Sequence, residues 1–143
     1  MTNNIEILQV GWQENEAELR SIRTTVFIEE QQVPVELEWD EDDLDCVHLL
    51  VKKGADYIAT ARLLNSGQIG RMAVLKPYRK SGIGSMLLTK LLSIAKSMKM
   101  NDVFLNAQIN ALSFYKQHGF NETGDIFDDA GIPHIRMEKE VKG

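Results

Sequence analysis

The sequence predicts a mixed α+β domain with the element order β-α-β-β-β-α-β-α-β-β. Three observations lead to this prediction. Apolar, β-rich runs are separated by short glycine-containing turns, a long segment after residue 82 has apolar residues at helical spacing, and the chain ends in two further β-rich runs. A chain of 143 residues with 43% hydrophobic residues can bury one core, so we expect residues 1–143 to form a single domain.

The first half of the chain predicts an edge strand, a helix and an antiparallel meander. Ile5–Val10 has the composition of a strand, and Asn15 with Glu18 three residues later is typical of a helix start with a capping box. Pro34 ends that helix or follows its end. Three β-rich runs joined by turns then predict the meander: Cys46–Lys53, Tyr57–Leu64 and Ile69–Leu75.

The second half predicts two helices and three strands. From Ile83 to about Met100, apolar residues recur at helical spacing, which indicates a long helix. A shorter helix is expected over Ala111–His118, with Gly119 closing it. The remaining apolar runs are typical of strands: Asp102–Ala107, Phe120–Phe127 and Ile135–Val141.

Composition limits the class of function. No apolar run approaches the roughly 20 residues that span a bilayer, and the N-terminus lacks a signal-peptide pattern, so we expect a cytoplasmic protein with no membrane partner. The one cysteine, Cys46, excludes an internal disulfide and a cysteine-based metal cluster. The three histidines are far apart in the sequence and form no ligand pair, so no metal site is indicated.

The acidic residues are concentrated in one segment. The net charge of −5 argues against a nucleic-acid partner. Nine acidic residues and no Lys or Arg lie from Glu29 to Asp45, so the rest of the chain carries a net charge of +4. A basic body suits a phosphate-bearing cofactor, and the acidic segment predicts either a solvated loop or a surface that attracts a positively charged acceptor.

The segment Arg79-Lys80-Ser81-Gly82-Ile83-Gly84 lies between a strand-like run and the long helix. Glycine lets a ligand approach the backbone closely, and the free N–H groups of a helix N-terminus favour an anion such as a pyrophosphate. The spacing matches neither the P-loop nor the dinucleotide fingerprint. Taken alone, it is equally compatible with a simple tight turn.

With its surroundings, this segment resembles the acetyl-coenzyme A motif of the GNAT family of N-acetyltransferases, whose signature is Arg/Gln-x-x-Gly-x-Gly/Ala after a strand. The resembling run covers residues 70–88, and a second element follows at Gln108, Ala111, Phe114-Tyr115 and Gly119-Phe120. Other segments are similar to the small bacterial acetyltransferases of the ElaA/YjcF type: Glu29–Pro34, Glu38–Asp40, Thr60–Leu63 and Gly131–His134. The resemblance implies the GNAT fold, a single twisted mixed sheet of about six to seven strands with helices on both faces.

The resemblance also implies acetyl-coenzyme A as co-substrate, and no metal. Its pantetheine arm would run along a strand like an added peptide, and residues 69–75 would have to splay away from residues 103–107 to make room. Its phosphates would meet the amides of the following loop. The cofactor residues implied in this way are Met72, Ala73, Val74, Arg79, Lys80, Ser81, Gly82, Ile83, Gly84, Ser85, Gln108 and Tyr115.

The implied reaction is direct attack of a neutral primary amine, on a small molecule or a peptide, on the thioester carbonyl. The resemblance assigns Tyr115 as the general acid and the Val74 N–H as the oxyanion donor. The general base stays open between Glu30 and His48. Candidates for the acceptor side are Glu29, Glu30, Glu38 and His134.

Two other classes of function remain. A coenzyme A-binding sensor or partner-binding module would keep the fold without turnover; the presence of Tyr115 favours the enzyme, and the lack of an obvious base favours the sensor. A nucleotide-binding protein could use the Gly82–Gly84 loop, but it would need a parallel unit that the antiparallel meander disfavours. The sequence leaves open the acceptor and the choice between monomer and homodimer.

Overall fold

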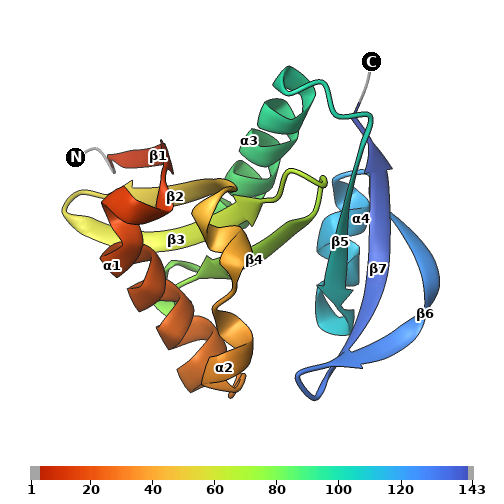
Figure 1. The fold of residues 1–143 in the computed structure, drawn as a ribbon, viewed down its shortest axis with the longest axis horizontal. Coiled ribbons are helices and arrows are strands. Elements are labelled where there is room, and N and C mark those ends of the chain that lie inside the picture. Colours follow the sequence, from red (N-terminus) through yellow and green to blue (C-terminus); the bar gives the residue numbers. More distant parts are fainter. Residues whose placement is uncertain (1–3, 142–143) are drawn as a thin grey trace.

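The computed structural model describes residues 4–141. Figure 1 shows their arrangement, and the α+β class and element order predicted from the sequence are confirmed, with one additional short helix, α2. The elements are β1 Ile5–Val10, α1 Trp12–Arg23, α2 Val35–Glu38, β2 Val47–Lys53, β3 Asp56–Leu63, β4 Ile69–Val74, α3 Ile83–Ser97, β5 Asp102–Gln108, α4 Leu112–Gln117, β6 Asn121–Asp129 and β7 Ile132–Glu140.

Two element starts differ most from prediction. Helix α1 begins at Trp12 rather than Asn15, and the expected start at Asn15 falls on a kink within the helix, where the dihedral angles are non-helical and the Asn15 side chain donates to the Glu18 carboxylate at 3.0 Å. Strand β7 begins at Ile132, so it includes Pro133. Proline is tolerated there because β5 ends opposite His134, which leaves β6 as the only strand beside Pro133.

Helix α1 continues into a wider π-helical segment, Thr24–Glu30. At its end the Gln31 N–H bonds the Val26 carbonyl five residues back, at 3.1 Å. Such segments frequently lie at functional sites. This one ends at Glu30, just inside the acidic segment that begins at Glu29.

The strands form two antiparallel sheets rather than the single mixed sheet expected. Their orders are β1-β2-β3-β4 and β5-β7-β6. Between β4 and β5 there is one parallel bridge, Gln68 to Phe104, where the Phe104 N–H bonds the Gly67 carbonyl at 3.0 Å. Beyond this bridge the two strands diverge (Figure 1), as the expected splay of residues 69–75 from residues 103–107 requires.

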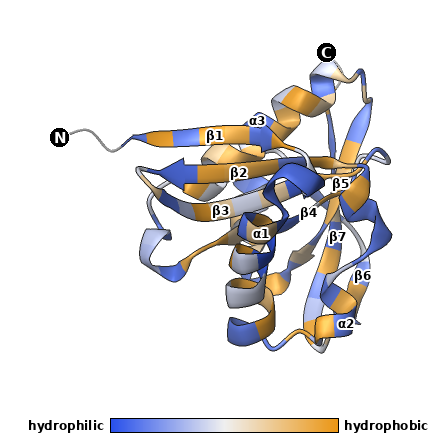
Figure 2. Ribbon diagram, turned by 60° about the vertical axis from the view of Figure 1, so that its left-hand side comes forward, coloured by the Kyte–Doolittle hydropathy of each residue, from blue (hydrophilic) through white to orange (hydrophobic). Residues whose placement is uncertain are grey.

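Helices cover both faces of the first sheet. Leu87 and Leu91 of α3 pack with Leu49 of β2 on one face, whereas Leu19 of α1 packs with the adjacent Leu50 on the other. Figure 2 shows hydrophobic residues along β1, β2 and β3, while α1 is mostly hydrophilic. Within residues 4–141, no helix combines the length and the apolar character needed to cross a bilayer.

Candidate functional site

Strand β4 carries a β-bulge where the two sheets separate. Thr60 pairs with Ala73 and Arg62 with Gly70, so Arg71 and Met72 together oppose a single residue of β3. Arg71 has a φ of +49°, in the left-handed region that long side chains rarely occupy. A bulge redirects the side chains of its strand, and both bulged residues line a cavity.

This cavity of about 310 Å³ opens between β4, the end of β5, α4, the segment 27–38 and the β6–β7 hairpin. It brings together predicted site residues that are distant in the sequence: Glu38, Met72, Gln108, Tyr115 and His134. Its other polar lining side chains are Gln31, Gln68, Arg71, Asn106 and Asp129. Glu29, Glu30 and His48 are not among its lining residues.

Tyr115 extends from α4 toward the bulge of β4. Its hydroxyl lies 3.8 Å from the Met72 sulfur, and the rings of Phe114 and Phe120 hold it by edge-on packing at centroid distances of 5.1 and 6.0 Å. Burial raises the pKa of Tyr115 to about 12. The phenol therefore keeps its proton at neutral pH and can donate it to a group placed beside Met72.

The open edge of β4 presents backbone groups to the space between the sheets. The Leu75 N–H bonds the Ile58 carbonyl of β3 at 2.9 Å. Because successive peptide groups of a strand alternate in direction, the Val74 N–H points away from β3, toward the gap between the sheets, although Val74 is not among the residues that line the cavity. The Val74 carbonyl accepts a hydrogen bond from Arg79 Nε at 2.7 Å.

The loop that enters α3 contains two residues in left-handed conformation, Lys80 with φ +62° and Gly82 with φ +86°. A Cβ built on Gly82 would meet nothing within 4 Å, so a ligand can approach the backbone here, whereas a Cβ on Gly84 would lie 3.4 Å from the Phe114 ring. The first N–H groups of α3 have no partner within the helix and favour an anion. The loop Lys80–Ser85 therefore fits the phosphate groups of the expected co-substrate.

Arg79 is bound within the protein. Its two terminal nitrogens contact the Glu30 carboxylate at 2.6 and 2.7 Å, in addition to the bond from Nε to Val74. The hydrogen bonds from Arg79 lower the pKa of Glu30, which makes Glu30 a poor proton acceptor. The pair joins the loop before α3 to the end of the π-helical segment, and Arg79 does not present a free charge.

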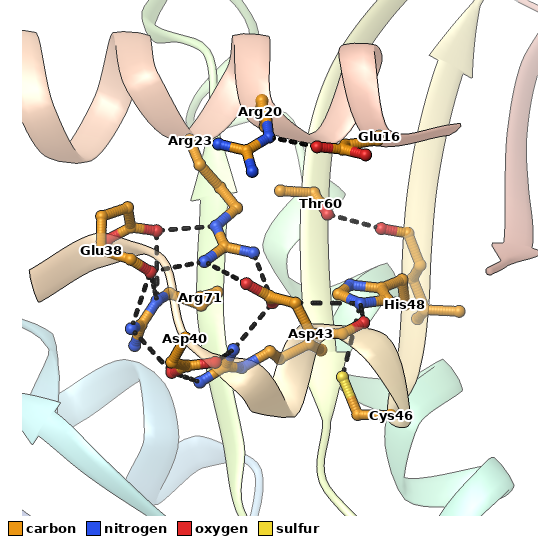
Figure 3. A network of polar contacts seen from close by, with 12 residues as sticks. Glu16, Arg20, Arg23, Glu38, Asp40, Asp43, Cys46, His48, Thr60 and Arg71 are labelled. Carbon is orange, nitrogen blue, oxygen red and sulfur yellow. Dashed lines mark hydrogen bonds and ion pairs between the residues drawn. The ribbon is translucent and has the colours of Figure 1, made fainter. Parts of the chain in front are cut away.

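Three carboxylates of the acidic segment, Glu38, Asp40 and Asp43, pair with arginines (Figure 3), whereas its other six acidic residues are exposed. Arg23 Nε lies 2.6 Å from a Glu38 oxygen, and Arg23 Nη1 lies 2.8 Å from an Asp43 oxygen. Arg62 contacts the same Asp43 oxygen at 2.8 Å. Burial alone would raise the pKa of Asp43, but the hydrogen bonds and charges of the two arginines outweigh it and hold that pKa below its usual value.

Three further pairs, one of them between Arg71 and Asp40 at 3.4 Å, complete this arginine–carboxylate network, which consists of Arg23, Glu38, Asp40, Asp43, Arg62 and Arg71. Arg62 contacts Asp40 at 2.8 Å, and Arg71 contacts Glu38 at 3.1 Å. Glu38 is 2% exposed. Three cations compensate three carboxylates, so Glu38 lines the cavity without offering the free negative charge expected of an acceptor wall.

His48, the other candidate base, belongs to this buried region. Its Nε2 lies 2.8 Å from the Asp43 carbonyl oxygen and 3.4 Å from the Cys46 sulfur, and burial lowers the pKa of His48. Asp43, Cys46 and His48 place potential ligand atoms within 4.8 Å of one another. The Asp43 carboxylate is already engaged by two arginines, and burial raises the pKa of the Cys46 thiol to about 11, so we assign no metal to this group.

His134 and Gln108 face each other as cross-strand partners of β7 and β5. His134 is buried, its Nδ1 lies 2.7 Å from the Ile132 carbonyl oxygen, and its ring stacks on Phe127. Gln108 Nε2 donates to Gln31 Oε1 at 2.9 Å across the cavity. Sequence reasoning missed Gln31 and Arg71, since no local pattern links a residue after a helix, or one in a strand bulge, to a cavity.

The comparisons with known proteins agree with this geometry. The model of the acetyltransferase (GNAT) domain matches residues 14–141. The uncharacterized N-acetyltransferase YjcF of Bacillus subtilis is 35% identical over 133 residues, which is 88% of this chain and 95% of that protein. Protein ElaA of Escherichia coli is 34% identical over 132 residues, which is 86% of each.

Solved structures of similar proteins share the whole fold. The crystal structure of Escherichia coli ElaA matches with a TM-score of 0.84 at 31% identity, covering 94% of this chain and 99% of that chain. An acyl-CoA N-acyltransferase from Pseudomonas aeruginosa matches with a TM-score of 0.82 at 29% identity, covering 96% of this chain and 99% of that chain. Because the domain model covers nearly the whole described chain and these relatives match along most of their length, the chain belongs to the acetyltransferase (GNAT) domain family.

Proposed function

We propose that this chain transfers an acetyl group from acetyl-coenzyme A to a primary amine of a small molecule or peptide, by direct attack. The observation that carries the proposal is that Tyr115 and the bulge of β4 line one cavity, with the Tyr115 hydroxyl 3.8 Å from the Met72 sulfur. Helix α3, whose N-terminus suits phosphates, follows β4 in the chain. Family membership and the acyl-CoA N-acyltransferase structure support a coenzyme A thioester as co-substrate.

The residues that would hold the co-substrate come from both sheets. The backbone of Met72–Val74 lies along the open edge of β4, the loop Lys80–Ser85 supplies the helix N-terminus, and Gln108 lies across the opening at the end of β5. When bound there, acetyl-coenzyme A supplies an activated acyl group. Arg79 would position the loop rather than bind a phosphate itself, because its side chain bonds the Val74 carbonyl of β4 and the Glu30 carboxylate.

Two groups of the chain would act during transfer. The Val74 N–H would donate a hydrogen bond where negative charge develops on the carbonyl oxygen. Tyr115 would hold a proton at its hydroxyl for the departing sulfur, at a position fixed by Phe114 and Phe120. Both groups face the gap that the splay of β4 from β5 creates, which also leaves room for an acceptor.

The acceptor would enter the cavity lined by Gln31, Gln108 and His134. These side chains offer hydrogen-bond donors and acceptors, which suit a small polar amine or the amine of a peptide. The preference for a cationic acceptor can no longer rest on Glu38, which is paired with arginines, or on Glu29 and Glu30, which do not line the cavity.

A transfer assay tests the proposal. The protein is incubated with acetyl-coenzyme A and with spermidine, glucosamine or a lysine-containing peptide, while free thiol and N-acetylated product are measured separately. We expect at least one amine to yield both in equal amounts. Tight binding of coenzyme A with no acetylated product from any amine would instead support a coenzyme A-binding sensor.

A further inference from the structure

The hydrogen bond between His134 and Ile132 determines which nitrogen of the imidazole carries the proton. Nδ1 lies 2.7 Å from the Ile132 carbonyl oxygen, and a carbonyl oxygen only accepts. Nδ1 must therefore be the N–H donor, and in the neutral ring the free lone pair lies on Nε2. His134 is thus held in the tautomer that a general base needs.

The ring is also held in place. His134 is 8% exposed and lines the cavity, and its ring stacks on Phe127 at a centroid distance of 6.0 Å and an interplanar angle of 26°. Its cross-strand partner is Gln108, on the opposite side of the gap from Met72 and the open edge of β4. A base in this position can meet an amine held between the two sheets.

The other ionisable side chains of the cavity are less suited to accept a proton. Glu38 from α2 is paired with Arg23 and Arg71, and Arg71 from β4 is itself a cation. Tyr115 from α4 keeps its proton. Asp129 from β6 is exposed at the hairpin, where water solvates its carboxylate, whereas the imidazole is held inside the cavity.

We propose that His134 is the general base of the transfer, an assignment that rests on the proposed function. Nε2 takes one proton from the acceptor ammonium, which leaves a neutral amine and an imidazolium. The amine lone pair forms the C–N bond as the C–S bond breaks, and the sulfur receives the Tyr115 proton. The nitrogen loses its second proton to the Tyr115 oxygen, directly or through water, as the amide forms. Afterwards His134 releases its proton to water.

Two variants separate base chemistry from a structural role. His134→Asn retains an amide N–H near the position of Nδ1 for the Ile132 carbonyl but has no basic nitrogen. His134→Ala leaves a space that free imidazole can enter. Tyr115→Phe is the matched slow variant that still contains His134, and Asp129→Asn tests the remaining carboxylate of the cavity.

The measurement is the pH dependence of kcat/KM for whichever of the three probe amines is acetylated fastest. With the wild-type protein we expect a plateau from neutral pH up to the pKa of the amine, about 10 for an alkylamine, because His134 deprotonates the ammonium form. In His134→Asn only the neutral amine reacts, so log kcat/KM should rise with a slope of one. The loss should be about 10²–10⁴-fold near neutral pH and shrink as the pH rises.

Added imidazole should partly restore His134→Ala and leave Tyr115→Phe unchanged. Wild-type transfer together with an unaltered rate and plateau in His134→Asn would overturn the base assignment alone. A plateau lost in Asp129→Asn but kept in His134→Asn would overturn it in favour of Asp129. Absence of transfer by the wild-type protein to any probe would overturn both the assignment and the proposed function.

Discussion

In this protein the surroundings of a single side chain, rather than its residue type, determine which proton-transfer role it can take. Tyr115 and His134 lie in the same cavity and suit opposite tasks, because one keeps its proton and the other has a free nitrogen lone pair. Glu30 and His48, the two candidate bases that the sequence leaves open, are hydrogen-bonded to other groups outside the cavity. Residue type alone cannot distinguish these cases.

We predict that Tyr115→Phe lowers kcat by about 10²–10⁴-fold, because the variant loses a proton donor. The affinity for acetyl-coenzyme A should hardly change, since the ring still packs between Phe114 and Phe120. Single-turnover kinetics and calorimetry measure the two quantities separately. A wild-type rate with chemistry rate-limiting would reduce Tyr115 to a packing residue.

The elements themselves were largely predictable from the sequence. The spacing of apolar residues predicts the strands β1 to β4 and the helix α3, because such spacing can be read from residues that are close in the sequence. The bulge at Arg71, the π-helical segment and the arginine–carboxylate network were not predictable. Arg23 and Asp43 lie 20 residues apart in the sequence, and no local pattern shows that their side chains form an ion pair. Local conformation was predictable where it follows a motif, as in the glycine turn at Gly82, and the candidate site was not predictable where contacts between distant residues form it.

The loop before α3 gives the second prediction. Gly82→Val places a β-branched side chain at a φ of +86°, which costs about 1–3 kcal/mol and obstructs close approach to the backbone. We expect acetyl-coenzyme A affinity to fall severely. Gly54→Val, at a φ of +61° in the β2–β3 turn, is the matched control, because a Cβ there also meets nothing within 4 Å. It should lose similar stability in urea unfolding and keep its affinity; equal affinities in the two folded variants would contradict this assignment.

The arginine–carboxylate network gives the third prediction, on stability. Asp43→Asn removes the buried carboxylate that Arg23 and Arg62 share, so the network keeps one positive charge in excess, and we expect a loss of about 3–5 kcal/mol in the free energy of unfolding. The neighbouring Asp42 is exposed, and Asp42→Asn should change that free energy by less than about 0.5 kcal/mol. Urea unfolding at pH 7 compares them, and similar losses would show that the network is not responsible.

Acid should act on the same network. The pKa of His48 is lowered by burial, so its stabilising contribution is complete above about pH 6.5 and is lost as the pH falls. The pKa values of Asp40 and Asp43 are lowered too, because arginine partners outweigh their burial, so their contribution is lost below about pH 4. On acidification we expect the urea midpoint to fall first below about pH 6.5, when His48 takes up a proton, and again below about pH 4, when Asp40 and Asp43 do. A midpoint constant from pH 7 to 3 would contradict the prediction.

At the scale of the whole molecule, the proposed function depends on how the two sheets separate. The β1-β2-β3-β4 sheet supplies the open edge of β4, while the β5-β7-β6 sheet supplies Gln108 and His134. One parallel bridge joins them, at Gln68. A ligand that contacts both sheets takes the place of the strand pairing that β4 and β5 lack. Its binding should therefore perturb residues on both sides of the gap.

Amide-resolved NMR titration with coenzyme A tests this central claim most directly, because it locates binding without requiring turnover. We predict shifts at Met72–Val74 and Lys80–Ser85 on one side and at Gln108 on the other, with the β2–β3 turn at Gly54 unchanged. Shifts confined to one sheet, or to the outer face of α3 around Met86 and Lys90 against Ile7, would contradict the account.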